Sequence, residues 1–164
     1  MTPRYPIAIA AALVAGGAVL VPGSFGQDAA APAALTLKMA QREAKVSFVD
    51  VPPRMRGRRS SESPGDTVIS RGTLRSDSGA RAGRIHASFV VTGGRSPRTT
   101  EHVTGTVVLA DGQITIQGVF DNTGSDKDVV AITGGSGGRY EGARGSVEIT
   151  SGRRDVSFAF RFAQ

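Results

Sequence analysis

The two histidines, His86 and His102, are the side chains most suited to metal or acid–base chemistry in this chain. A metal site built on them would need a third ligand at close range, and no spacing in the sequence supplies one. A serine, a histidine and an aspartate can be combined on paper, but no nucleophile-elbow pattern is present. His86 is also out of phase with Ile85 and Ala87, so we expect it to face away from the interior. The sequence therefore predicts neither a metal site nor a hydrolytic triad.

The glycine-rich segment at residues 134–138, GGSGG, is a second candidate for chemistry. It lacks the Lys-Ser/Thr ending of a phosphate-binding loop, and strand-forming residues flank it on both sides. Each glycine would cost roughly 1 kcal/mol in a helix interior, whereas a chain reversal can use positive φ angles. We expect a hairpin in which Tyr140 packs over the turn and Arg144 braces backbone carbonyls. Its predicted residues are Gly134, Gly135, Gly137, Gly138, Tyr140, Gly142, Arg144 and Gly145.

Cysteine is absent, which excludes disulfides, thiol nucleophiles and cysteine metal sites. The chain carries 20 basic and 14 acidic residues, a formal net charge of +6. Its densest run of cations lies in a polar loop at residues 54–65, at Arg54, Arg56, Arg58 and Arg59. This run is either a solvated loop or a contact for an anionic cell-envelope surface. Because no aromatic residues are interleaved with it, we expect no nucleic-acid binding.

The first 26 residues have the layout of a secretory signal peptide. Arg4 precedes an uncharged apolar run from Ile7 to Val21, and Ser24 and Gly26 supply small residues at the two positions that a signal peptidase reads. The run is shorter than the ~20 residues that a membrane span needs. We therefore expect a secreted protein, extracellular or in the cell envelope, cleaved after Gly26 or within residues 28–34. Residues 27–44 are expected to be a flexible leader, although apolar and polar residues alternate over 35–39, and 45–164 a single domain.

From residue 45 onward, short alternating segments follow one another with turn residues between them. Period-two alternation of this kind is typical of strands with one buried face. Eight strands are expected and no helix: residues 45–51, 67–76, 83–92, 101–109 and 113–120, one on each side of the glycine-rich turn within 129–150, and 155–162. Even spacing with tight turns favours an all-β antiparallel sandwich or barrel. An eight-stranded barrel is either filled by side chains or just wide enough for one small ligand.

Two segments resemble a known family closely. TIQGVF (residues 115–120), followed after an acidic loop by AITGGSGGRYEGARGSVEI (residues 131–149), is similar to plant allene oxide cyclases and, more loosely, to dirigent proteins. Upstream, GDTVISRGTL (65–74) and AGRIHASFVV (82–91) fall where that family has its second and third strands. The resemblance implies a single eight-stranded antiparallel β-barrel, often trimeric, without a metal or organic cofactor. It also implies that a small, oxygenated, largely apolar molecule is held in one conformation inside the barrel.

The catalytic residues of the cyclases are not reproduced. The resemblance places their epoxide-polarising glutamate at Phe48, and the asparagine two residues on at Asp50. Their second-strand asparagine falls on Gly72, and their cavity cysteine on Phe89. We therefore do not expect allene oxide cyclisation, because a shared barrel does not imply a shared reaction.

If they point inward, these positions and Ser70 would line the ligand cavity: Phe48, Asp50, Ser70, Gly72 and Phe89. Asp50 is the candidate catalytic group, since a buried carboxyl resists ionisation and can act as a general acid. Alternatively, Asp50 lies at the rim, solvated or paired with an arginine, because unpaired buried carboxylates are costly. The two phenylalanines could equally be ordinary core residues.

Three functions remain open at this stage. The first is an exported barrel that binds a small apolar molecule and acts as a dirigent-like guide. The second is a cofactor-free cyclase or isomerase that uses Asp50, and the third is an interaction module of the cell envelope. The resemblance also predicts a homotrimer, whose interface could use Ile69, Val103 and Val107 if they face outward.

Overall fold

The computed structural model describes residues 32–52, 62–95, 98–122 and 126–163. The expected signal peptide, the start of the leader and the Arg54–Arg59 run lie outside the described residues. Within the described part, no helix is long and apolar enough to cross a membrane.

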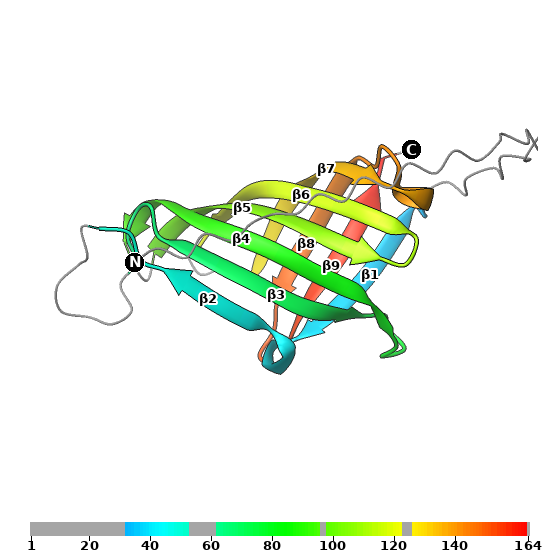
Figure 1. Ribbon diagram of the computed structural model, residues 1–164, viewed down its shortest axis with the longest axis horizontal. Helices are drawn as coiled ribbons and strands as arrows, with labels where there is room; N and C mark the ends of the chain where they lie inside the picture. Colours follow the sequence, from blue (N-terminus) through cyan, green and yellow to red (C-terminus); the bar gives the residue numbers. More distant parts are fainter. Residues whose placement is uncertain (1–31, 53–61, 96–97, 123–125, 164) are drawn as a thin grey trace, which may run out of the picture.

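The described chain is almost entirely β-structure (Figure 1). Glycine, proline, Asp-Gly and Ser-Gly sequences separate the strands, as turn chemistry requires. Two short 3₁₀ turns, η1 (Gln41–Glu43) and η2 (Gly138–Tyr140), interrupt the strands. The strands are β1 (Ala34–Ala40), β2 (Lys45–Val49), β3 (Thr67–Arg75), β4 (Arg81–Arg95), β5 (Arg98–Leu109), β6 (Gly112–Asp121), β7 (Lys127–Ser136), β8 (Gly145–Ser151) and β9 (Asp155–Phe162). The predicted all-β class is confirmed.

Eight of the strands close into an antiparallel barrel, and β2 is an additional strand at its side. The order is β1-β9-β8-β7-β6-β5-β4-β3-β2, and β1 also pairs with β3, through Lys38 opposite Arg75. The first strand of the barrel is therefore β1, and not the segment from residue 45 that we expected. The prediction of a flexible leader is wrong over Ala34–Ala40, because Leu37 and Met39 point into the barrel and are buried.

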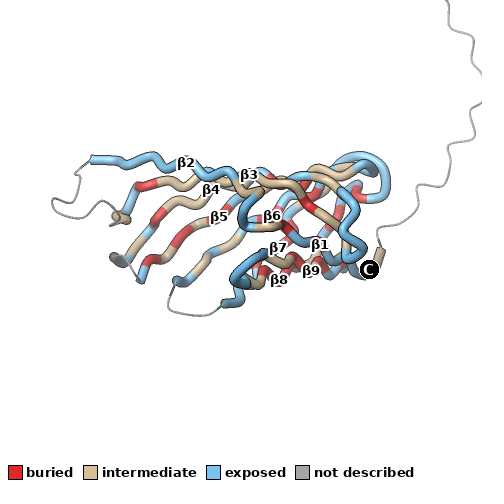
Figure 2. Tube along the Cα trace, turned by 90° about the horizontal axis from the view of Figure 1, so that it is seen from below, coloured by how far each residue is buried: buried red, intermediate tan, exposed pale blue. Residues whose placement is uncertain are grey.

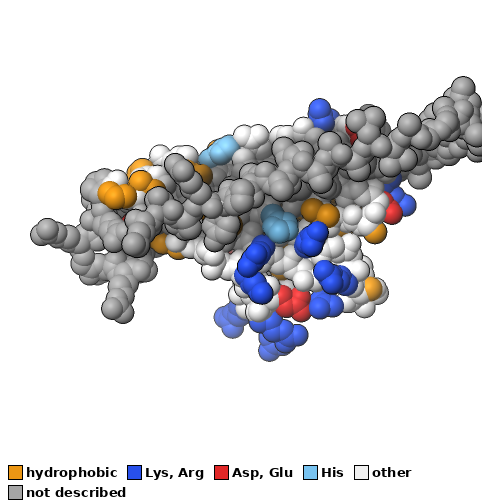
Figure 3. All heavy atoms as spheres, in the orientation of Figure 1, with side chains coloured by type: hydrophobic (Ala, Val, Ile, Leu, Met, Phe, Trp, Pro, Cys, Tyr) orange, Lys and Arg blue, Asp and Glu red, His pale blue; other side chains and the backbone are white. Residues whose placement is uncertain are grey.

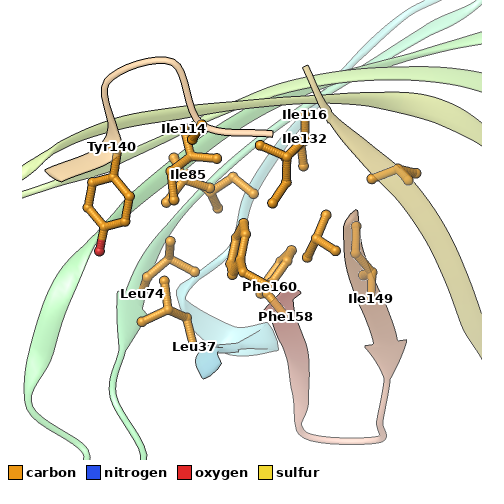
Figure 4. Packing of buried hydrophobic residues seen from close by; sticks show 14 of the residues in the cluster. Leu37, Leu74, Ile85, Ile114, Ile116, Ile132, Tyr140, Ile149, Phe158 and Phe160 are labelled. Carbon is orange, nitrogen blue, oxygen red and sulfur yellow. The ribbon is translucent and has the colours of Figure 1, made fainter. Parts of the chain in front are cut away.

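One face of each closing strand fills the barrel interior. Buried residues alternate with exposed ones along β5, β6, β8 and β9, as Figure 2 shows, so that branched aliphatic and phenylalanine side chains meet in the centre. Phe158 and Phe160 lie in the middle of this core, between Leu37, Leu74 and Ile85 (Figure 4). The rings of Phe160 and Phe162 stack at 6.3 Å, and Tyr140 packs on Phe162 at 5.8 Å. This aromatic row closes one end of the interior.

The glycine-rich hairpin connects β7 to β8, but its turn begins later than we expected. β7 continues through Gly134 and Gly135 to Ser136, and the reversal occupies residues 137–144. Gly137 and Gly138 have φ angles of 76° and 50°, a conformation that favours glycine. The Arg144 guanidinium donates to the carbonyl oxygens of Gly142 and Ala143, which confirms the predicted bracing.

Two residues that we considered as outward-facing point into the barrel instead. Val103 and Val107, which we considered for an interface between subunits, are 1% and 0% exposed and belong to the interior. The two-residue period of alternation along β5 was correct, but these two residues belong to its inward face. Ile69 is outward and 48% exposed, and His86 is exposed as predicted.

Gly135 provides a test of this hairpin. A Cβ at this position would overlap the backbone carbonyl oxygen of Tyr140 and approach Ala143 Cβ to 2.9 Å. We expect Gly135→Ala to lower the free energy of unfolding by about 1–3 kcal/mol, as overpacking does. Gly93→Ala is the control, because nothing lies within 4 Å of its Cβ position, and it should change stability by less than about 0.5 kcal/mol. Urea denaturation measures both, and equal effects would contradict the proposed packing.

Candidate functional site

The part of the barrel interior that side chains leave open is a cavity of about 400 Å³. Its floor is the core itself, since Ile85, Ile116 and Phe158 belong to both. On the far wall, Phe89 and Phe120 meet edge to face with centroids 5.5 Å apart. The cavity is lined by Met39, Gln41, Ala44, Val46, Ser70, Ile85, Ala87, Phe89, Val103, Ile116, Phe120, Ile149, Ser151, Val156 and Phe158. Its size and apolar walls match those of small-molecule sites.

Three lining residues are polar, and none is charged or titratable. The Gln41 amide donates to the carbonyl oxygen of Gly152 at 2.6 Å, which fixes η1 against the β8–β9 turn. Among the described residues, no side-chain hydrogen bond involves the hydroxyl of Ser70 or of Ser151, so both can bond to a ligand. The cavity therefore favours a neutral, largely apolar molecule with one or two polar atoms.

Of the five residues predicted for this cavity, Ser70 and Phe89 line it. Gly72 lies beside it, and the Met39 thioether occupies the space where a Gly72 side chain would be. Phe48 and Asp50 do not line it: Phe48 is 51% exposed on β2, and Asp50 is exposed just beyond that strand. The physical reason is that β2 pairs only with β3, outside the closed barrel, so it reaches the cavity through Val46 near its start, while Phe48 lies farther along the strand.

A different carboxyl group, that of Glu101, is buried on the inner face of β5, two residues before Val103 in the sequence. Glu101 Oε1 accepts hydrogen bonds from the Thr99 hydroxyl, at 3.1 Å, and from the Asn122 amide. Burial raises the pKa of Glu101 above its usual value, and the nearby Glu62 carboxylate adds to this effect. Burial likewise raises the pKa of Asp128. Glu101 is opposite Phe120 in the β5–β6 ladder but is not among the residues that line the cavity.

The chain segment before β3 is fixed at this end of the barrel by Asp66, which is 1% exposed. Its carboxylate accepts hydrogen bonds from the backbone N–H groups of Val51, at 2.8 Å, and Ser63, at 2.7 Å. The bond from Val51 is the main reason that the pKa of Asp66 is held below its usual value, against the opposing effect of burial. Asp66 therefore has a structural role as a charged anchor.

Sequence reasoning missed Glu101, although a signal was present. Glu101 occupies the inward phase of β5, with Val103, Gly105 and Val107, and a charged residue in that phase is unusual. It also missed Gln41, which belongs to the stretch we expected to be flexible. No group of three histidine or acidic side chains that could hold a metal ion occurs in the described part of the chain.

The comparisons with known proteins agree with this geometry. The model of the allene oxide cyclase barrel-like domain matches residues 54–160, which is well over half of the chain. The chain belongs to this family. No curated protein matches its sequence.

Solved structures share the fold of this allene oxide cyclase-like barrel at low sequence identity. A pyocyanin demethylase is 20% identical, with a TM-score of 0.64 over 79% of this chain and 99% of the demethylase. The Diels–Alderase AbmU from Streptomyces koyangensis is 17% identical, with a TM-score of 0.60 over 80% of this chain and 64% of AbmU. The pterocarpan synthase dirigent protein GePTS1 is 13% identical, with a TM-score of 0.57 over 79% of this chain and 81% of that protein. Such likeness shows the fold alone, and these barrels act on different small molecules.

Glu101 makes the stability of this barrel depend on pH. Because its pKa is raised on folding, the folded protein holds the proton more tightly than the unfolded chain does. The free energy of unfolding should therefore fall as the pH rises from the usual glutamate pKa through the raised value. Glu101→Gln removes this loss, so the variant should gain stability relative to the parent between pH 4 and about pH 7. Urea midpoints at several pH values measure the difference, and a difference independent of pH would contradict the assignment.

Proposed function

We propose that this barrel binds one small, neutral, largely apolar molecule in its cavity and holds it in a single conformation. The observation that carries the proposal is the 400 Å³ cavity, which has two facing phenylalanine rings and two serine hydroxyls without side-chain partners among the described residues. Desolvating an apolar ligand against these walls supplies binding energy, and the hydroxyls orient its oxygen atoms.

We favour a dirigent-like guide over an acid–base enzyme. None of the residues that line the cavity is titratable, so no side chain there can transfer a proton to a bound molecule. A reactive guest would be directed by shape and by hydrogen bonds, which is catalysis through positioning. A cyclase or isomerase would instead need its ligand to reach Glu101, beyond the lining residues.

The cavity proposal is tested by filling the cavity. Ala87 points inward between Ser70 and Gly105, whereas its neighbour Ser88 points outward and bonds to Thr104 at 2.9 Å. We expect Ala87→Leu to weaken binding of a neutral apolar dye, N-phenyl-1-naphthylamine, by about tenfold, equivalent to ~1.4 kcal/mol. Ser88→Leu, with the same side chain on the outer face, is the control and should leave affinity within about twofold. Dye fluorescence measures both, and equal affinities in the two variants would reject the cavity as the binding site.

We also propose that the protein is exported and forms a homotrimer. Export rests on the signal-peptide pattern of residues 1–26. The trimer rests on the family and on exposed apolar residues of the outer wall, Ile69, Val119 and Val129, which are 48%, 56% and 64% exposed. A contact with an anionic envelope surface would follow from export.

One preparation tests both proposals. When the full-length chain is expressed in a secreting bacterial host, the protein recovered outside the cytoplasm should start within residues 27–35 and sediment as three copies at about 10 μM. N-terminal sequencing and sedimentation velocity give these results. An intact N-terminus on protein retained in the cytoplasm would reject export, and a monomer would reject the trimer.

A further inference from the structure

The positive charge of this protein is concentrated on one part of its outer wall. Two adjoining hollows, of about 510 and 340 Å³, lie on either side of β3 near η1 and the β8–β9 turn. Nine basic side chains line them, against three acidic ones, and the difference equals the formal charge of +6 of the whole chain. We call this surface the basic rim: Lys38, Arg42, Lys45, Arg71, Arg75, Arg81, Arg84, Arg153 and Arg154, with Glu43, Asp77 and Asp155. Lys and Arg side chains gather along the lower edge of the molecule in Figure 3.

Most of these cations are not neutralised by the protein. Lys38 pairs with Asp77 at 3.1 Å, and Arg75 pairs with Glu43 at 3.0 Å. For the other seven basic residues of the rim, no carboxylate of the described residues lies within ion-pair distance. All seven are exposed. Like charges that line the same hollows repel each other, so an external anion would stabilise the rim.

The architecture of the barrel explains why the two hollows lie next to each other. β1 and β3 share a single residue pair, Lys38 opposite Arg75, so the strand pairing at the closing seam is limited to that pair. The ion pair between Arg75, which lines the first hollow, and Glu43, which lines the second, lies between the two hollows. The cations therefore follow the curved wall from the β8–β9 turn, across the seam, to the outer face of β4.

The shape and composition of the rim select among anionic partners. A flat bilayer touches a curved wall along one line only and cannot reach both hollows, and no large apolar side chain of the rim is exposed to insert into lipid. Phenylalanine, tyrosine and tryptophan, the best stacking platforms for nucleic-acid bases, are absent from the described lining of both hollows, where His86 supplies a single ring. Arginine forks bind carboxylate and similar planar oxyanions in a bidentate manner. A flexible chain of carboxylate-bearing sugars meets these requirements.

We propose that the basic rim is a binding groove for an acidic polysaccharide, which lies across the β1–β3 seam and contacts both hollows. The groove adjoins the barrel cavity, because Gln41 and Ile85 line both, but none of the rim cations lines the cavity. Polymer binding and ligand binding can therefore be lost independently. The Arg54–Arg59 run lies outside the described residues and is not counted in the rim.

The experiment uses the full-length chain and fluorescein-labelled oligogalacturonate, an unbranched uronate polymer, with binding followed by anisotropy. Arg153→Glu with Arg154→Glu removes cations from the first hollow, and Arg71→Glu with Arg84→Glu removes them from the second. Each pair should weaken binding by about tenfold at low salt. The control, Arg98→Glu with Arg161→Glu, changes the net charge equally at exposed positions outside the rim and should weaken binding less than about threefold. Arg→Gln pairs replace any Arg→Glu pair that fails to fold by circular dichroism.

Binding of N-phenyl-1-naphthylamine should be unchanged in both rim variants, which separates this inference from the cavity proposal. The groove is rejected if the control loses as much affinity as the rim variants, because net charge alone would then explain binding. It is also rejected if oligo(dT) or phosphatidylglycerol vesicles bind more tightly than oligogalacturonate and depend on the same arginines. These outcomes would assign the rim to a nucleic acid or to a lipid surface.

Discussion

The closure of the sheet by β1 is the constraint on which the rest of this structure depends. β1 pairs along its whole length with β9, from Ala34 opposite Arg161 to Ala40 opposite Asp155, and touches β3 through one pair. Without it, the edges of β9 and β3 would expose unpaired backbone groups, and Leu37 would lose its buried position. The contact joins segments about 120 residues apart, which makes the barrel a single cooperative unit.

The same closure produces both candidate binding surfaces. Inside, Leu37 and Met39 cover one side of the core, while the 3₁₀ turn after β1 carries Gln41 and Ala44 to the edge of the cavity. Outside, the one-pair seam between β1 and β3 leaves the groove in which the cations gather. The extra strand β2 then continues from this turn along β3, outside the closed barrel.

The two surfaces have contrasting chemistry. The cavity contains no charged side chain, because a lone charge in an apolar interior would be strongly destabilising. The carboxyl group that is buried nearby, that of Glu101, accepts hydrogen bonds from Thr99 and Asn122 and does not line the cavity. The basic rim is solvent-exposed, where water screens its cations and lets them remain ionised. One barrel thus offers an apolar interior for a small molecule and a polar wall for a charged partner.

The sequence by itself determined the β-class, seven of the eight barrel strands and the inward phase of residues such as Phe89, Ile116 and Phe160, while the family resemblance supplied the barrel. Alternation is a local property, and each strand carries it regardless of its partner. It also determined the bracing of the glycine-rich turn by Arg144, since turn chemistry is local too.

Only the tertiary structure decided which strand closes the barrel. A seven-residue strand such as β1 looks like a leader until its partner, far along the chain, is known. With β1 as the closing strand, Phe48 and Asp50 are exposed, Ser151 lines the cavity and Glu101 is buried. The closure by β1 also brought Lys38 and Arg42, Arg75, and Arg153 from three separate segments into one groove. Long-range pairing depends on the summed packing of the whole interior, and no local pattern of residues encodes it.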